Sequence, residues 1–124
     1  FEFINKDIVT EKIFEKIKLN FANKLNQFYK DITRDNKEFI FILHPGAGHF
    51  FPQSETYDPN KLDASLLSLL DPRIKVINVS EKLSDIVNRE KNKSFYYKYD
   101  GHYNIEGYKA VSDIINVELK KILK

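Results

Sequence analysis

The run Phe39–Leu43, which reads FIFIL, decides the fold class of this chain. Five consecutive apolar residues without polar alternation are typical of a central strand in a parallel sheet that is covered on both faces. The stretch Ile74–Val79 is short and rich in β-branched residues, so it predicts a second strand. Helical patterns precede, separate and follow these two runs. This alternation predicts an α/β domain of three layers, in which helices cover both faces of a parallel sheet.

The longest helical pattern covers Asp7 to Asp35. Its apolar residues recur at steps of three or four, which is the spacing of one helix face, so we expect a single buried stripe. Asn36 follows as a natural stop, because asparagine tolerates the left-handed conformation found at helix ends. The predicted stripe comprises Ile13, Ile17, Phe21, Leu25, Phe28 and Ile32.

Three further helices are predicted. Asp58 and Pro59 are typical of an N-cap and a first helical position, and the pair Asp71-Pro72 should end that helix. Ser80 is expected to cap the next helix. The final helix is predicted from about Ile105 to Leu123. Its inward face is predicted to contain Tyr108, Val111, Ile114 or Ile115, Leu119 and Ile122.

The composition predicts one folded domain over residues 1–124. A hydrophobic fraction of 42% is that of a globular protein, and 20 basic against 18 acidic residues leave a net charge of +2. Because the cations are scattered and nearly all of them are lysines, no nucleic-acid partner is expected. The chain has no cysteine, which excludes disulfides and thiolate zinc sites. No apolar run approaches the roughly 20 residues of a membrane span, so none is expected in this chain.

The chain begins with Phe1 and contains no methionine. Residue 1 is therefore not a translation start, and we expect that an upstream segment was removed. The predicted sheet is also thin, with two clear strands where doubly wound domains commonly have about five. Both observations predict that the chain is the carboxyl-terminal portion of a larger α/β domain.

The segment Tyr99–Ala110 reads YDGHYNIEGYKA and carries the clearest chemical signal. Asp100 and His102 stand two residues apart on a short loop before the last helix. Histidine titrates near neutral pH, and a nearby carboxylate holds its ring and stabilises its protonated form. Asn104 is a good N-cap for the helix, and Gly107 would let that helix pack closely against a neighbouring strand. We therefore predict that Asp100 and His102 form a catalytic pair in which His102 is the general base.

Two further histidines, His44 and His49, flank a glycine-containing turn directly after the first strand. In open α/β sheets, ligands bind outside the carboxyl ends of the strands, where both this turn and the Asp100 loop are expected. We predict that His44 and His49 contact substrate. A zinc site with Asp100 as third ligand is a weaker alternative, because the spacing of these residues matches no metal motif. The prediction is therefore no metal and no cofactor.

The pattern D-G-H-Y-N-x-x-G, followed by an apolar helix, resembles the carboxyl-terminal block of SGNH (GDSL-type) hydrolases over residues 95–123. The resemblance implies a flavodoxin-like three-layer fold and a Ser-His-Asp triad, in which Asp100 and His102 supply the acid and the base. Family members are esterases and acyltransferases, and many act on acetyl groups of carbohydrates. The resemblance thus implies a small-molecule or carbohydrate acyl ester as substrate, and an extracytoplasmic or secreted location.

The family's nucleophile block, a Gly-Asp-Ser near the start of the domain, is absent from this sequence. None of the serines in the chain lies in a nucleophile motif. Ser54, on the loop predicted from His44 to Tyr57, could be free to act, but no pattern in the sequence supports that role. We expect an upstream segment of the same domain to supply the serine, which makes that segment a partner of this chain.

A second hypothesis is a non-catalytic α/β module that binds a sugar or a protein partner and keeps the Asp100–His102 loop as a structural turn. A third is a metal-dependent hydrolase that uses the three histidines of the chain. An upstream segment with Gly-Asp-Ser would favour the enzyme, and a mature start at Phe1 would favour the binding module.

Overall fold

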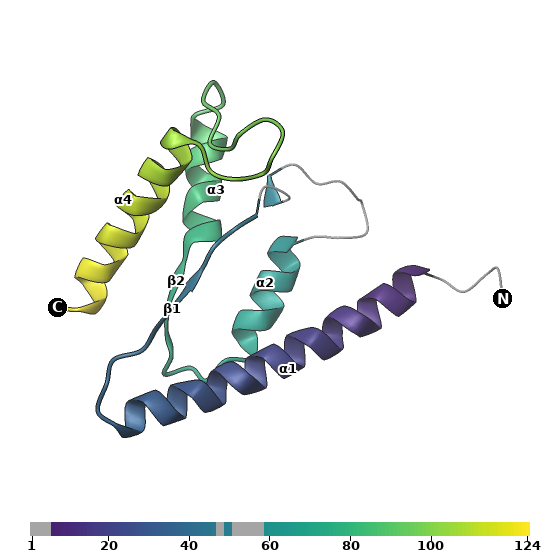
Figure 1. Cartoon of the computed structure of the whole chain (residues 1–124), viewed down its shortest axis with the longest axis vertical. Coiled ribbons are helices and arrows are strands. Elements are labelled where there is room, and N and C mark those ends of the chain that lie inside the picture. Colours follow the sequence, from purple (N-terminus) through teal and green to yellow (C-terminus); the bar gives the residue numbers. More distant parts are fainter. Residues whose placement is uncertain (1–5, 47–48, 51–58) are drawn as a thin grey trace. The chain divides into compact units, whose positions relative to one another are not determined.

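The computed structural model describes residues 6–46, 49–50 and 59–124 of the chain (Figure 1). These residues form an α/β structure with four helices and a two-stranded parallel sheet, which confirms the predicted α/β class. The internal contacts group the chain into two compact units. One unit contains residues 1–39 and 54–74, and the other contains residues 40–53 and 75–124.

The first unit pairs a long helix with a short one. Helix α1 spans Lys6–Arg34 and helix α2 spans Pro59–Ser68. The bounds of α1 confirm the predicted long helix. Asn36, just beyond it, has a φ of 60°, which is the left-handed conformation expected at a helix end.

The predicted burial of the apolar stripe on α1 is wrong. Four of its members are between 45% and 57% exposed, namely Ile13, Ile17, Phe21 and Phe28. Among the described side chains of α1, the buried ones are Lys18 and Ala22. Helix α2 contacts α1 where the Lys18 ammonium donates a hydrogen bond to Ser65 Oγ at 2.5 Å. Ile17 and Phe21 stay at the edge of this contact, where they line an open pocket with Leu62 and Leu66 of α2. Helix periodicity determines which residues share a face, but the position of the partner helix determines which face is covered.

Helix α2 ends at Ser68 rather than at the predicted Asp71. Asn26 of α1 accounts for the early end, because its side chain forms hydrogen bonds with the backbone that follows α2. Its Nδ2 donates to the Leu69 carbonyl at 3.0 Å, and its Oδ1 accepts the Asp71 N–H at 2.7 Å. The N-cap predicted at Asp58 lies outside the described residues.

The second unit contains the sheet and two helices. Strands β1 (Ile40–Leu43) and β2 (Lys75–Asn78) pair in parallel along their whole length, which confirms both predicted strands. Helix α3 (Val79–Arg89) follows β2 without a connecting loop, and helix α4 (Ile105–Ile122) is the last element of the chain.

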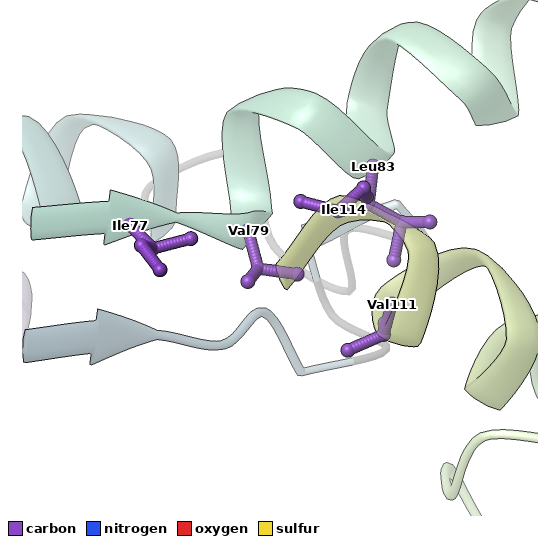
Figure 2. Close-up of a cluster of buried hydrophobic side chains, with 5 residues drawn as sticks. All are labelled: Ile77, Val79, Leu83, Val111 and Ile114. Carbon is purple, nitrogen blue, oxygen red and sulfur yellow. The ribbon is translucent and has the colours of Figure 1, made fainter. Parts of the chain in front are cut away.

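The core of this unit forms where β2, α3 and α4 meet. Its buried cluster consists of Ile77, Val79, Leu83, Val111 and Ile114 (Figure 2). Burying each of these side chains contributes roughly 1.5–3 kcal/mol. Because the cluster joins α3 to α4, it fixes the two ends of the loop between them, and this loop carries the predicted catalytic pair.

Two predictions about these helices are wrong. The N-cap of α3 is Asn78 and not Ser80, since Asn78 Oδ1 accepts the Glu81 N–H at 3.1 Å. The strand runs straight into the helix, which places Ser80 inside the first turn with its side chain buried. Tyr108 was predicted to face inward but is 61% exposed, because α4 turns Val111 and Ile114 toward the core and leaves Tyr108 at the edge.

We predict that Leu83→Ala destabilises the second unit by about 2–5 kcal/mol, because it leaves a cavity at a side chain with 0% exposure. The free energy of unfolding, measured by urea denaturation, checks this. Leu123→Ala makes the same substitution at a side chain that is 62% exposed, and its effect should stay within about 0.5 kcal/mol. Equal losses in the two variants would contradict the assigned core.

Candidate functional site

The loop between α3 and α4 is closed by a short antiparallel pairing of its two arms. Tyr96 and Tyr103 form an isolated bridge, and the Tyr97 N–H donates to the His102 carbonyl at 2.9 Å. The pairing fixes the main chain of His102 on its carbonyl side.

Asp100 and His102 lie at the tip of this loop. Between them Gly101 has a φ of 71°, a left-handed conformation that glycine adopts without steric cost. The resulting turn lets Oδ1 of Asp100 accept the His102 N–H at 2.9 Å, and the same oxygen lies 3.4 Å from Nδ1 of the imidazole. The carboxylate therefore stands beside one ring nitrogen, and the other nitrogen, Nε2, is directed away from it.

Both side chains of this pair are open to solvent. The His102 side chain is 76% exposed and that of Asp100 is 58% exposed. A reactant can therefore reach Nε2 of His102 without any movement of the fold. Both hydrogen bonds of the His102 main chain are made within the loop, one to the Asp100 carboxylate and one from the Tyr97 N–H.

Asn104 ties the loop to α4 and confirms the predicted N-cap. Its Oδ1 accepts the Gly107 N–H at 2.9 Å, and its Nδ2 donates to the Ser94 carbonyl at 2.8 Å. The Asn104 N–H also donates to the Phe95 carbonyl at 3.1 Å. One side chain thus satisfies the first turn of the helix and the opposite arm of the loop at once.

Gly107 confirms the predicted close approach, although its neighbour is the main chain of Phe95 rather than a strand of the sheet. A β-carbon built at Gly107 would lie 2.0 Å from the Phe95 carbonyl oxygen and 3.1 Å from the β-carbon of Tyr103. No side chain fits at this distance. The absence of a β-carbon at position 107 therefore lets α4 start directly against the loop that carries His102.

The structure places the two other predicted site residues after β1. His44 is exposed, and its ring centroid lies 6.3 Å from that of Tyr103, the residue next to His102. His49 is half-buried, and its Nδ1 lies 3.1 Å from the Gly46 nitrogen and 3.2 Å from the Gly46 oxygen. His44 thus lies beside the motif loop, whereas the described contacts of His49 stabilise its own turn.

A row of aromatic rings connects Phe50, the two tyrosines of the loop and Tyr108 of α4, and the sequence did not predict it. The Tyr96 ring lies 5.8 Å from Phe50 and 5.0 Å from Tyr103, and the Tyr103 ring lies 5.5 Å from Tyr108. Ring separations in this range are typical of favourable aromatic packing. The signal in the sequence was the clustering of Tyr96 and Tyr103 on either side of the Asp100–His102 turn.

Burial of these phenols changes their acidity. Burial raises the pKa of Tyr96 well above its ordinary value, and the neighbouring Tyr103 phenol adds to the effect. Burial also raises the pKa of Tyr103. The Tyr96 hydroxyl has no hydrogen-bond partner within the described part of the chain. Both phenols therefore stay protonated in the folded state when an exposed phenol would ionise.

The described residues supply no metal cluster, and the serine that follows β2 is buried. The described side chains, those of residues 11–46, 49–50 and 59–124, include no group of three or more His, Asp or Glu that could hold a metal ion. Ser80 follows β2 but is 2% exposed, and Ser54 lies outside the described residues. No helix in the described part of the chain has both the length and the apolar character needed to cross a membrane.

The second unit also has a groove of about 510 Å³ between α3 and α4. Phe95, Ile86 and Ile114 contribute apolar side chains to it. Charged side chains of both signs line it as well, and Lys82 of α3 lies 3.9 Å from Glu118 of α4. The groove is distinct from the exposed turn at Asp100 and His102, neither of which lines it.

No family model, curated protein or solved structure significantly matches this chain.

We predict that Gly107→Ala destabilises the protein by about 1–3 kcal/mol or more, because the new β-carbon clashes with the Phe95 carbonyl. On an open helix surface the same change would be stabilising, because alanine has the higher helix propensity. Urea denaturation measures the effect. Ser112→Ala, at an exposed position of α4, is the control and should be neutral or slightly stabilising. A stabilised Gly107→Ala variant would show that α4 does not approach the loop.

We predict a loss of stability at alkaline pH that depends on Tyr96. Below about pH 10 the phenol is protonated in both the folded and the unfolded state, so it contributes no pH dependence. Above that pH the unfolded state loses the proton first, because the pKa is raised in the folded state. The free energy of unfolding therefore falls as the pH rises further.

Urea denaturation at about pH 8 and about pH 10.5 measures this fall. Tyr96→Phe should reduce it. Tyr99→Phe, which removes a phenol on a residue that is 89% exposed, should leave it as in the wild type. An unchanged fall in Tyr96→Phe would contradict the burial of this hydroxyl.

Proposed function

We propose that this chain is part of a serine esterase or O-acyltransferase that acts on acyl esters, in particular acetyl esters, with carbohydrate esters among the substrates. The single observation that carries the proposal is the geometry of the Asp100–His102 turn. It supplies a carboxylate 3.4 Å from Nδ1 of an exposed imidazole whose main chain is fixed. This arrangement is what a general base in acyl transfer requires.

In the proposed reaction, His102 handles the proton and Asp100 orients His102. A serine from a segment outside this chain would attack the ester carbonyl, and Nε2 of His102 would accept its proton. A proton on Nδ1, the nitrogen that lies 3.4 Å from the Asp100 carboxylate, would leave Nε2 free as acceptor, and the carboxylate would stabilise the imidazolium that forms. His102 would then return the proton to the leaving alcohol, and no cofactor is required.

We also propose that the two described strands belong to a larger flavodoxin-like sheet of three layers. The parallel pairing of β1 with β2 and the direct entry of β2 into α3 support this. In such sheets the reactive groups gather at the carboxyl ends of the strands, and His44 follows the carboxyl end of β1. His44 and His49 are then substrate contacts, and the family resemblance favours an extracytoplasmic or secreted location.

We predict that His102→Ala lowers the turnover of p-nitrophenyl acetate by the longest native form of the protein about 10²- to 10⁴-fold, the usual contribution of a general base. Lys98→Ala changes an exposed side chain of the same loop and should keep the wild-type rate. Near-UV circular dichroism shows whether each variant is folded.

Two results would contradict the proposal: an inactive wild-type protein, or a His102→Ala variant that is as active as the wild type. Either would favour the second candidate, a non-catalytic module that binds a sugar or a protein partner. The observation that favours this candidate is the groove between α3 and α4, whose apolar and charged side chains suit a protein partner.

A further inference from the structure

Tyr103 lies at the junction between the Asp100–His102 turn and the interior of the second unit. It directly follows His102 and takes part in the bridge with Tyr96. The chain bends at His102, directly before the bridge residue Tyr103. Tyr103 is half-buried while His102 is exposed. Because the Tyr103 ring is held inside, the His102 imidazole is directed outward.

The ring of Tyr103 is held by packing. It lies 5.0 Å from the Tyr96 ring and 5.5 Å from the Tyr108 ring, and it contacts the buried cluster of the second unit. Turning the main chain at His102 would pull this ring out of its contacts. The free energy of ring burial therefore resists any change in the direction of His102.

The hydroxyl of Tyr103 reaches a second segment. It donates a hydrogen bond to the carbonyl of Pro45 at 3.3 Å, across 58 positions of sequence. Pro45 is buried, its φ is restricted by its ring, and it directly follows His44. The Tyr103 and His44 rings also lie 6.3 Å apart. One side chain thus contacts both the loop of the predicted base and the turn of the predicted substrate contact.

We propose that Tyr103 is a positioning residue that holds the His102 imidazole and the His44–Gly46 turn in one fixed arrangement. Its ring orients His102, and its hydroxyl orients the turn. This proposal rests on the proposed acyl-ester function, in which His102 is the base and His44 contacts substrate. Tyr103 itself accepts no proton in the reaction and acts through these neighbours.

The two parts of the side chain can be separated by substitution. Tyr103→Phe keeps the ring and removes the hydrogen bond to Pro45, so KM for p-nitrophenyl acetate should rise about three- to tenfold with kcat changed less than twofold. Tyr103→Ala also removes the ring, so kcat should fall about 10- to 100-fold. A purely structural effect would reduce the folded fraction, which lowers apparent kcat and leaves KM unchanged.

Tyr99→Phe is the matched control, because it deletes a phenol hydroxyl on a residue that is 89% exposed in the same loop. It should change neither KM nor kcat. A KM for Tyr103→Phe equal to that of the wild type, or an equal rise in Tyr99→Phe, would overturn the proposal.

Imidazole NMR tests the same coupling without activity. The chain has three histidines, so their ring carbon-bound protons give three sets of signals that substitution can assign. Tyr103→Phe should shift the His44 signals and leave those of His102 in place, and Tyr99→Phe should shift neither set. Unchanged His44 signals in Tyr103→Phe would overturn the coupling. If the wild type does not turn over the ester, the proposed function fails. The His44 signals still test whether the Tyr103 hydroxyl holds the His44–Gly46 turn in place.

Discussion

Where the Asn104 N–H donates to the Phe95 carbonyl at 3.1 Å, the chain leaves the loop and begins α4. This hydrogen bond and the one from Tyr97 to His102 close the loop on itself. Because the two arms of the loop are paired, the chain must turn at Gly101. This turn places the Asp100 carboxylate beside the His102 ring. The main-chain hydrogen bonds thus set the turn on which the exposed pair lies.

The same closure depends on how closely α4 approaches. The helix can begin against the Phe95 carbonyl because Gly107 has no β-carbon, and Asn104 uses both atoms of its amide to hold the two arms. The position of α4 is also held by the buried cluster around Leu83 and Val111, which joins this helix to α3. The apolar core fixes α4 against α3, and the Asn104 cap fixes the loop against the start of α4. The position of His102 depends on both.

The proposed reaction places two opposite demands on His102. A general base must be accessible to its reactant, yet its direction must be fixed before the reaction begins. The exposure of the His102 side chain meets the first requirement. The packed, half-buried ring of Tyr103, on the next residue, meets the second. These two consecutive residues differ in exposure where the chain bends at His102 and then enters the bridge at Tyr103.

The sequence by itself determined the kinds and the order of the elements. Apolar runs gave both strands of the sheet, and local chemistry gave the cap at Asn104 and the helix end at Asn36. These features depend on residues close together in the chain, which is why they can be predicted. The pairing of Asp100 with His102 is equally local, since two residues and a glycine make the turn.

Tertiary structure decided the features that depend on distant residues. Periodicity grouped the apolar residues of α1 on one face, but the position of α2 buried Lys18 and Ala22 instead. Ser80 has a side chain suited to an N-cap, yet β2 continues directly into α3, so that Asn78 is the N-cap residue. The contact of Tyr103 with Pro45 spans 58 positions, and no local pattern marks it. A side chain's neighbours across such a distance are set by packing, whereas its conformational preference is set by the residues beside it.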